Sequence, residues 1–267
     1  MQDFSFWDAV EIGVGQCVSW TVGKLALWAE HYEQEWHVLP LYDEGIAEKS
    51  SFSVRSKSEK PESTEWNHYL LKDGSWVYPL PVMMDRPVLI RPDRTLVLLS
   101  GEQARFYVAL PLWLSLRVGG KEKASTAKKL NAFPILPMVN AWFGDPVSGE
   151  LCYFTATRLY PGLEQIPFSS YHAICSLSIK NDSEKDLPFD RLCLHTEFLN
   201  IYQGLTRFWT NDVSVVYKGI DQGTQVVPSK GAPALDGSSH LIASSRQPIE
   251  NWYIKRTFNL LKYFTGF

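Results

Sequence analysis

Short runs of alternating residues, separated by Gly, Pro and Asp, are the feature that most limits how this chain can fold. Glu150, Cys152 and Phe154, for example, alternate with Leu151 and Tyr153. Successive side chains on a strand point to opposite faces of a sheet, so this spacing gives each strand two different faces. Aromatic residues, 13% of the chain, suit the cross-strand pairs of a sheet. We therefore expect an all-β protein with antiparallel, β-sandwich-like layers in two β sub-domains.

Turn signals separate the expected strands. Asp73-Gly74 stands between two apolar runs and predicts a β-hairpin, because both residues tolerate positive φ. The stretch GDPVSG, residues 144–149, predicts the turn of a second hairpin. Residues 24–41 also fit an amphipathic helix, because their apolar side chains recur at near-helical spacing. We favour strands there.

Composition divides the chain into three parts. The polar and basic stretch 119–130 marks the expected boundary between an N-terminal β sub-domain, residues 1–120, and a C-terminal β-sandwich-like sub-domain, residues 121–247. Residues 45–65 hold few large apolar side chains and many Ser, Lys and Glu, so we expect a mobile loop there.

The third part, residues 248–267, predicts a C-terminal amphipathic helix. On a helical wheel its Asn and Lys residues form one narrow stripe, and most other positions are apolar or aromatic. So much apolar surface has to be covered, either by the protein's own sheet or by something outside it. Trp252 and Phe258 are therefore candidate contacts for a partner protein or a membrane surface.

Charge and cysteine usage limit the partners and the location. The net charge of -3, from 26 basic and 29 acidic residues, lacks the positive excess that a phosphate backbone requires, so we expect no nucleic acid. The four cysteines have no CxxC spacing, and the first ten residues show no basic region followed by an apolar run. No apolar stretch is long enough to span a membrane. We expect a cytoplasmic protein with reduced thiols that would reach the inner membrane only as a peripheral protein.

Motifs of the common catalytic and cofactor sites are missing. Gly13-Val14-Gly15 begins like a dinucleotide fingerprint but lacks the third glycine and the βαβ unit. Gly120-Lys121 is not a P-loop, because no glycine stands five residues before Gly120. GxSxG, HExxH and EF-hand patterns are absent. We expect no cofactor, no catalytic residue and a protein that is not an enzyme.

The stretch HYEQEWH offers a metal-binding alternative. On one extended strand its two imidazoles and two carboxylates would share a face, and such a row could hold zinc, manganese or iron. The row consists of His31, Glu33, Glu35 and His37. If the chain turns near Glu33, the row is broken and these residues become solvated edge groups.

A second polar row alternates with apolar residues at Arg191, Cys193, His195 and Glu197. Cys193 and His195 would share a strand face, where a nucleophile and its base could meet, but a solvent-facing polar row explains the spacing equally well. A zinc site that added His172 and Cys175 would need a β-bulge, because those two residues have the wrong parity for one flat strand face.

The hairpin around residues 144–149 carries a candidate site for a ligand or partner. A turn explains the Gly, Asp and Pro residues of this stretch but not the aromatic residues beside it. Trp142 and Tyr153 would flank a pocket, or else form a cross-strand aromatic pair. Asp145 and Glu150 would stand at the mouth of that pocket, which would suit a sugar-like ligand.

Three stretches in this order resemble one known family: DRPVLIRPDRTLVLLSGEQARFYVALPLWL, AWFGDPVSGELCYFTATRL and LSIKNDSEKDLPFDRLCL. The chain is similar, from Trp20 to Tyr217, to a bacterial and archaeal family called domain of unknown function four-three-two. The Trp-Phe-Gly-Asp-Pro and Gly-Glu-Leu-Cys-Tyr stretches are the most specific part. The resemblance implies no activity, cofactor or catalytic residue. It implies a membrane-associated partner by association alone, since members are encoded beside small mechanosensitive channels.

These observations favour a non-enzymatic binding or regulatory protein that acts through protein–protein contact, with a membrane-associated partner such as a mechanosensitive channel included. One alternative is a metal-dependent or carbohydrate-directed enzyme. Another is self-association as a structural subunit of a homo-oligomer, which the aromatic content and uncovered sheet edges would favour.

Overall fold

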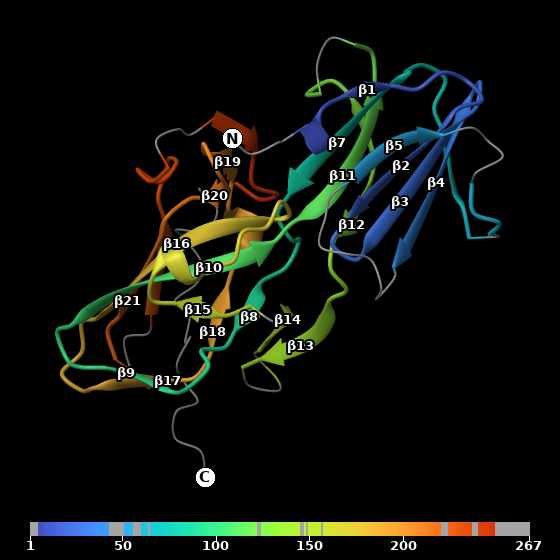
Figure 1. The fold of residues 1–267 in the computed structure, drawn as a ribbon. Coiled ribbons are helices and arrows are strands. Elements are labelled where there is room, and N and C mark those ends of the chain that lie inside the picture. Colours follow the sequence, from blue (N-terminus) through green and yellow to red (C-terminus); the bar gives the residue numbers. More distant parts are fainter. Residues whose placement is uncertain are drawn as a thin grey trace. The chain divides into compact units, whose positions relative to one another are not determined.

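The computed structural model describes most of the chain: residues 5–42, 51–55, 60–63, 65–121, 124–144, 147, 149–155, 157–219, 224–236 and 240–248. Within these ranges the protein is all-β, as expected, with strands and short 3-10 helices (Figure 1). The chain divides into two compact units that are described separately. None of the helices in the described ranges is long and apolar enough to cross a membrane. The predicted helix at residues 248–267, with Trp252 and Phe258, lies outside the described residues from residue 249 onward.

Each unit is assembled from separated segments of the chain. Unit 1 combines residues 1–82, 112–137 and 169–171, and the remaining segments make unit 2. The polar stretch 119–130 therefore lies inside unit 1, where it connects two paired strands. The polar and small residues of this stretch therefore lie between two strands that pair with each other as a hairpin.

Unit 1 contains two antiparallel sheets. The five-stranded sheet has the order β5 (Ser51–Arg55), β2 (Cys17–Val22), β3 (Leu25–His31), β4 (Glu35–Tyr42) and β6 (Asn67–Leu70). The four-stranded sheet has the order β1 (Val10–Glu11), β7 (Trp76–Val82), β11 (Trp113–Gly119) and β12 (Lys128–Pro134). The short helix η1 (Ser5–Trp7) precedes β1.

The core of unit 1 follows from alternation in the five-stranded sheet. Trp20, Leu27 and Trp36 have no exposed surface, and the strand register places all three on one face. Burial of each such side chain stabilises the fold by about 1.5–3 kcal/mol. The opposite face carries the partly exposed His37 together with Glu30 and Leu39, which are buried, and Glu30 Oε2 lies 2.8 Å from Lys60 Nζ.

Two local expectations in unit 1 are corrected. Residues 45–65 were expected as a mobile loop but contain β5, whose Ser53 hydroxyl lies 2.9 Å from that of Ser19 on β2. Phe52 and Val54 alternate with serines in this strand, a local pattern that the average composition of residues 45–65 conceals. The predicted helical alternative for residues 24–41 is excluded, because β3 and β4 occupy that stretch.

The hairpin predicted at Asp73-Gly74 is wrong. β6 and β7 flank these residues but belong to different sheets: β6 pairs with β4, whereas β7 pairs with β1 and β11. Gly74 does have a positive φ of 126°, and a Cβ there would lie 3.0 Å from the Cα of Gly119. The glycine thus permits a close backbone approach while the chain crosses from one sheet to the other.

Unit 2 contains three sheets. The eight-stranded sheet has the order β15 (Leu159–Tyr160), β10 (Gln103–Pro111), β16 (His172–Asn181), β20 (Phe208–Thr210), β19 (Ile201–Gln203) and β23 (His240–Ala243), with β21 (Val213–Tyr217) and β22 (Thr224–Pro228) extending from β16. The hairpin sheet has the order β13 (Val139–Phe143), β14 (Glu150–Phe154), β8 (Val88–Ile90) and β18 (Leu192–Leu194). The two-stranded sheet pairs β17 (Leu187–Phe189) with β9 (Leu96–Leu98).

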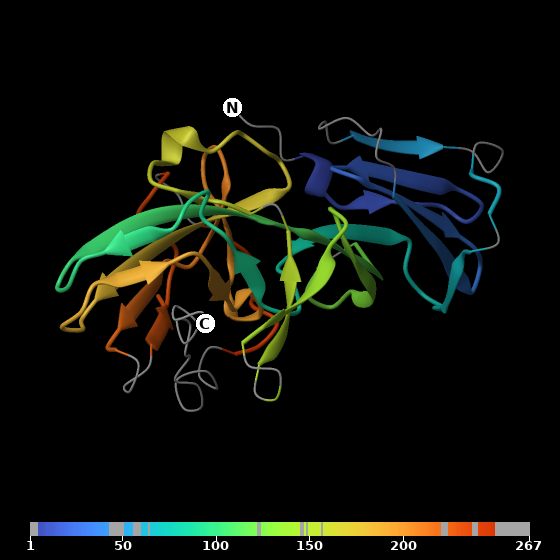
Figure 2. The ribbon, with the colours of Figure 1, turned by 90° about the horizontal axis from the view of Figure 1, so that it is seen from below.

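Long and short elements have different roles in unit 2. The longest pairing between described strands of unit 2 joins β10 to β16, which are neighbours inside the eight-stranded sheet (Figure 2). Most pairs are antiparallel, as expected, but β8 runs parallel to β14, and β16 runs parallel to β20 and β21. The helices η3 (Leu163–Gln165) and η4 (Thr196–Phe198) are single turns. Helix η4 follows β18 directly and positions the candidate site described below.

Gly23, in the turn between β2 and β3, provides a test of the packing in unit 1. Its φ is +58°, and a Cβ there would lie 2.6 Å from Cγ2 of Ile135. Gly101 also has a positive φ, but a Cβ there meets nothing within 4 Å. We expect Gly23→Ala to lower the free energy of unfolding by about 1–3 kcal/mol more than Gly101→Ala, because only the first adds overpacking to backbone strain. Urea unfolding measures both, and equal losses would contradict this packing.

Candidate functional site

The hairpin predicted around residues 144–149 is confirmed. β13 pairs with β14 in antiparallel register, from Val139 opposite Phe154 to Phe143 opposite Glu150. β13 has no second partner in the described chain, so the hairpin forms one edge of the hairpin sheet.

The register distributes the predicted site residues over two faces of this sheet. Trp142 lies opposite Leu151, and Tyr153 lies on the same face, diagonal to Trp142. Glu150 and Cys152 lie on the other face. Glu150 therefore does not stand at the mouth of a pocket between the two aromatic side chains. Asp145 lies outside the described residues, as do Trp252 and Phe258.

Tyr153 has a structural role in this geometry. Its side chain is buried, and its hydroxyl donates a hydrogen bond to Asp85 Oδ1 at 2.8 Å. The Arg86 guanidinium lies 5.5 Å from the centre of its ring. Burial and the hydrogen bond to Asp85 raise the pKa of Tyr153 to about 12. Trp142, by contrast, is half exposed, so the two residues do not form the pair of open rings that a sugar would stack on.

The other face of the hairpin sheet holds a cluster of chemically active side chains. We call it the Cys–His cluster: Glu150, Cys152, Cys193, His195 and Glu197. Strand β8 lies between β14 and β18, and Leu89 on β8 pairs with Phe154 on one side and Cys193 on the other. Because side chains two residues apart share a face, Glu150, Cys152 and Cys193 all lie on the same side of the sheet.

The distances within the Cys–His cluster are those of direct contact. His195 Nε2 lies 3.1 Å from Glu150 Oε1, and the Cys193 thiol lies 3.6 Å from the same oxygen. His195 Nδ1 lies 2.8 Å from Glu197 Oε1. The Cys152 thiol is in hydrogen-bond contact with the thiol of Cys193, and both cysteines are free.

Burial and hydrogen bonding shift the titration of these groups. The hydrogen bond from Cys193 lowers the pKa of Cys152, and the same contact together with burial raises the pKa of Cys193 well above its ordinary value. Burial alone would lower the pKa of His195, but hydrogen bonds to Glu150 and Glu197 outweigh it and raise that pKa. The two thiols thus lie beside an imidazole that two carboxylates hold in place.

The chemistry of the Cys–His cluster fits a transition metal. Ligand atoms of Glu150, Cys193 and His195 all lie within 4.8 Å of one another. With metal–ligand bonds of about 2.3 Å to sulfur and about 2.1 Å to nitrogen or oxygen, a tetrahedral zinc ion spaces sulfur and oxygen about 3.6 Å apart and nitrogen and oxygen about 3.4 Å apart. The distances from Cys193 and His195 to Glu150 are close to these values.

Sequence reasoning grouped three of the five residues of the Cys–His cluster: Cys193, His195 and Glu197. The alternation placed Cys193 and His195 on one face, but nothing local showed that Glu150 and Cys152, from a segment more than forty positions away, lie on the same face. His172 and Cys175 do not join them, because both lie on β16 of the eight-stranded sheet. Burial raises the pKa of Cys175 to about 12, so that thiol stays protonated.

The predicted row at His31, Glu33, Glu35 and His37 is interrupted in unit 1. The chain turns between β3 and β4, so Glu33 lies in the turn. His31 is buried on the core face, with Nδ1 2.7 Å from the carbonyl oxygen of Ile12 and its ring stacked on Trp36. Glu35 and His37 remain together on the opposite face of the sheet, where His68 joins them.

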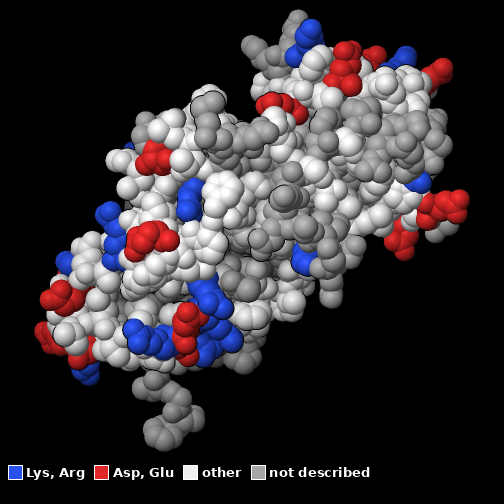
Figure 3. Space-filling model, viewed as in Figure 1, with Lys and Arg blue, Asp and Glu red and all other residues white. Residues whose placement is uncertain are grey.

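Basic and acidic side chains are mixed on the part of the surface that Figure 3 shows. On the face drawn in Figure 3, blue basic and red acidic side chains lie among one another. Two of the close pairs join Arg158 to Asp93 and Arg191 to Asp190.

The hydrogen bond from Tyr153 to Asp85 predicts a pH-dependent stability. The pKa of the Tyr153 phenol is about 12 in the folded protein and about 10 in the unfolded chain. The folded state therefore keeps the phenol proton to higher pH, and the stabilisation is lost as the pH rises from about 10 to about 12. We expect Tyr153→Phe to lower the free energy of unfolding by about 1 kcal/mol at neutral pH. Urea unfolding of both proteins should show this difference shrinking at alkaline pH, whereas a constant difference would contradict the assignment.

Comparison with known proteins supplies the family. No curated protein and no solved structure matches the chain. One family model, described as "Protein of unknown function (DUF432)", matches residues 6–262 and so covers both units. The chain belongs to this uncharacterised family.

Proposed function

We propose that this protein is a metal-responsive binding protein. In this proposal the Cys–His cluster holds a zinc ion beneath the β13–β14 hairpin, and the hairpin contacts another protein. The observation that carries it is the convergence of Glu150 on β14, Cys193 on β18 and His195 directly after β18, whose ligand atoms lie within 4.8 Å of one another although β14 and β18 are not neighbours.

The surroundings of His195 support a metal. Histidine ligands usually donate their second ring N–H to a carboxylate, which fixes the tautomer and the ring orientation. Glu197, buried in η4, lies at that position, 2.8 Å from Nδ1, and leaves Nε2 directed at Glu150. Buried polar groups are costly unless they are paired, so two buried thiols, a buried imidazole and the buried Glu197 carboxylate beside the partly exposed Glu150 favour a role beyond packing.

The number of ligands favours a non-catalytic metal. Cys152 lies in contact with Cys193, and rotation of its side chain would bring a second sulfur to the ion as fourth ligand. Four protein ligands close a tetrahedral zinc site, whereas catalytic zinc sites keep one position open. A closed site at this place would tie β14 to β18 across β8 and stiffen the hairpin.

Metal analysis of purified full-length protein tests this assignment. We expect the Cys–His cluster to bind close to one equivalent of zinc per chain. Cys193→Ser should lower the zinc affinity of this cluster at least about 100-fold, because it removes a thiolate ligand. Glu197→Gln is expected to lower the affinity about 10–100-fold without touching the metal, since it only holds His195.

Cys175→Ser is the matched control, because Cys175 is also buried but lies in the eight-stranded sheet. Its zinc affinity should equal that of the wild type. Equal zinc binding by wild type and Cys193→Ser, with both proteins folded by circular dichroism, would overturn the proposal.

The exposed side chains of the hairpin support a protein contact. Five large apolar residues between positions 139 and 154 are at least 39% exposed: Val139, Trp142, Val147, Leu151 and Phe154. Trp142 and Leu151 are cross-strand neighbours on one face of the hairpin, and Val139 and Phe154 are neighbours on the other face. Exposed apolar surface marks interaction sites, and an edge strand offers backbone groups to a partner. The partner we propose is another protein or a second copy of the chain. A membrane-associated partner such as a mechanosensitive channel rests on the family resemblance alone.

Site-specific photo-crosslinking identifies what contacts the hairpin. A photoreactive residue in place of Leu151 should give an adduct with one recurring protein, or with a second copy, in the cell that produces this protein. The same residue in place of Leu205, which is 63% exposed but outside the hairpin, is the control. Matching adduct patterns from the two positions would count against the hairpin as the contact surface.

A further inference from the structure

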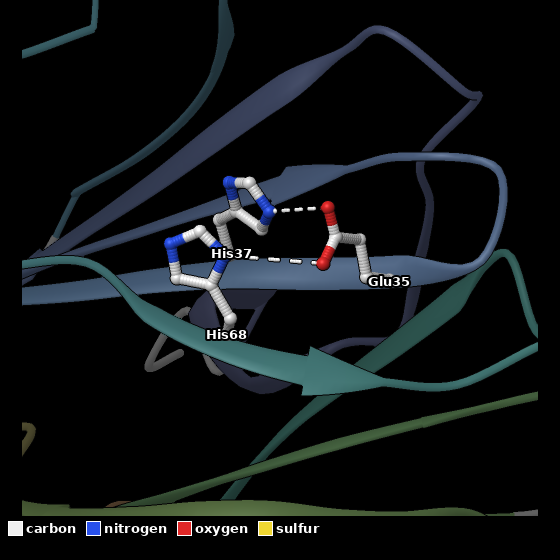
Figure 4. Close-up of side chains that lie close together, drawn as sticks. All are labelled: Glu35, His37 and His68. Carbon is white, nitrogen blue, oxygen red and sulfur yellow. Dashed lines mark ion pairs between the residues drawn. The ribbon is translucent and has the colours of Figure 1, made fainter.

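A second cluster, in unit 1, lies on one face of the five-stranded sheet. Glu35 and His37 are two residues apart on β4, and His68 on β6 pairs directly with His37. All three side chains therefore project from the same face (Figure 4). This face is the reverse of the one that carries Trp20, Leu27 and Trp36.

The three side chains are spaced as metal ligands. His37 Nε2 lies 2.9 Å from Glu35 Oε1, and His68 Nδ1 lies 3.8 Å from Glu35 Oε2. Their ligand atoms all lie within 4.8 Å of one another. Two ligand atoms at about 2.1 Å from a tetrahedral ion are about 3.4 Å apart, a value between the two distances.

Packing holds His37 in this position. Its ring lies 4.2 Å from the ring of Tyr32 and 3.8 Å from that of His68, measured between centroids. Nε2 of His37 is buried and makes no hydrogen bond of acceptable geometry to any described residue, despite its closeness to Glu35. An imidazole nitrogen that faces a carboxylate without a hydrogen bond has its lone pair or proton available for another partner.

The cluster is open on its solvent side. The side chain of His68 is 57% exposed and that of Glu35 is 33% exposed, whereas His37 is only 14% exposed. His37 is thus the least exposed of the three side chains, and solvent reaches the group from the side of Glu35 and His68. Two histidines and one carboxylate are the protein ligands of several catalytic zinc and non-haem iron centres, in which the remaining positions hold water or substrate.

We infer that Glu35, His37 and His68 form an open site for a divalent transition metal, with zinc as the ion and water in the remaining position. The site is separate from the Cys–His cluster in both residues and chemistry, because it contains no sulfur and has three protein ligands. A metal-bound water of this kind has a strongly lowered pKa and can act as a nucleophile near neutral pH.

Cobalt substitution of the full-length chain distinguishes the two sites. Cobalt bound by thiolates shows ligand-to-metal charge transfer in the near ultraviolet, and cobalt bound by histidine and carboxylate shows only the weaker visible bands. In the Cys152→Ser/Cys193→Ser background, which removes both thiols of the Cys–His cluster, we expect visible bands without charge transfer, from cobalt at Glu35, His37 and His68.

Four variants in that background locate the ion. His68→Ala and Glu35→Gln should weaken cobalt binding at least about 100-fold, because each removes a ligand. Glu33→Gln and His240→Ala should leave it unchanged, because Glu33 lies in the turn and His240 on an exposed strand elsewhere. Far-ultraviolet circular dichroism confirms that each variant is folded.

The results separate this inference from the proposed function. The site is supported if His68→Ala and Glu35→Gln lose the visible bands while Glu33→Gln and His240→Ala keep them. This holds whether or not the wild type shows charge transfer. Unchanged binding in folded Glu35→Gln, equal weakening in Glu33→Gln, or absence of any visible bands would overturn it.

Discussion

Backbone pairing between strands is the interaction on which the rest of this structure depends. Register decides which side chains share a face, and a shift of one residue would move every side chain to the opposite side. In the five-stranded sheet this places Trp20 and Trp36 in the core and Glu35 and His37 on the reverse. In the hairpin sheet it places Trp142 on one face and Glu150 on the other. Core and candidate sites therefore arise from the same alternation.

The two candidate sites differ in burial, and burial determines what each is suited for. The Cys–His cluster is largely buried and contains two thiols, and in the proposed site Cys152 supplies the fourth ligand. Glu35, His37 and His68 lie at the surface with three ligands and an accessible side. A closed site stabilises the strands that it joins, and an open one leaves room for water or substrate. One fold can thus carry a structural metal and an exchangeable one.

Alternation in the sequence was sufficient to predict an all-β chain, the β13–β14 hairpin and the shared face of Cys193 and His195. It was insufficient where distant segments meet. Asp73-Gly74 has the residues of a hairpin turn, yet β6 pairs with β4 and β7 pairs with β1 and β11, in two different sheets. His68 joins His37 through pairing between β4 and β6, which no local spacing reveals. The Cys–His cluster depends in the same way on β8, which lies between β14 and β18.

X-ray absorption spectroscopy at the zinc edge, on full-length His68→Ala protein loaded with one equivalent of zinc, tests the central claim most directly. If the Cys–His cluster takes that ion, the spectrum contains sulfur scatterers at about 2.3 Å together with nitrogen or oxygen at about 2.0–2.1 Å. A first shell made of nitrogen and oxygen alone would contradict the account, because no thiolate would then contact the metal.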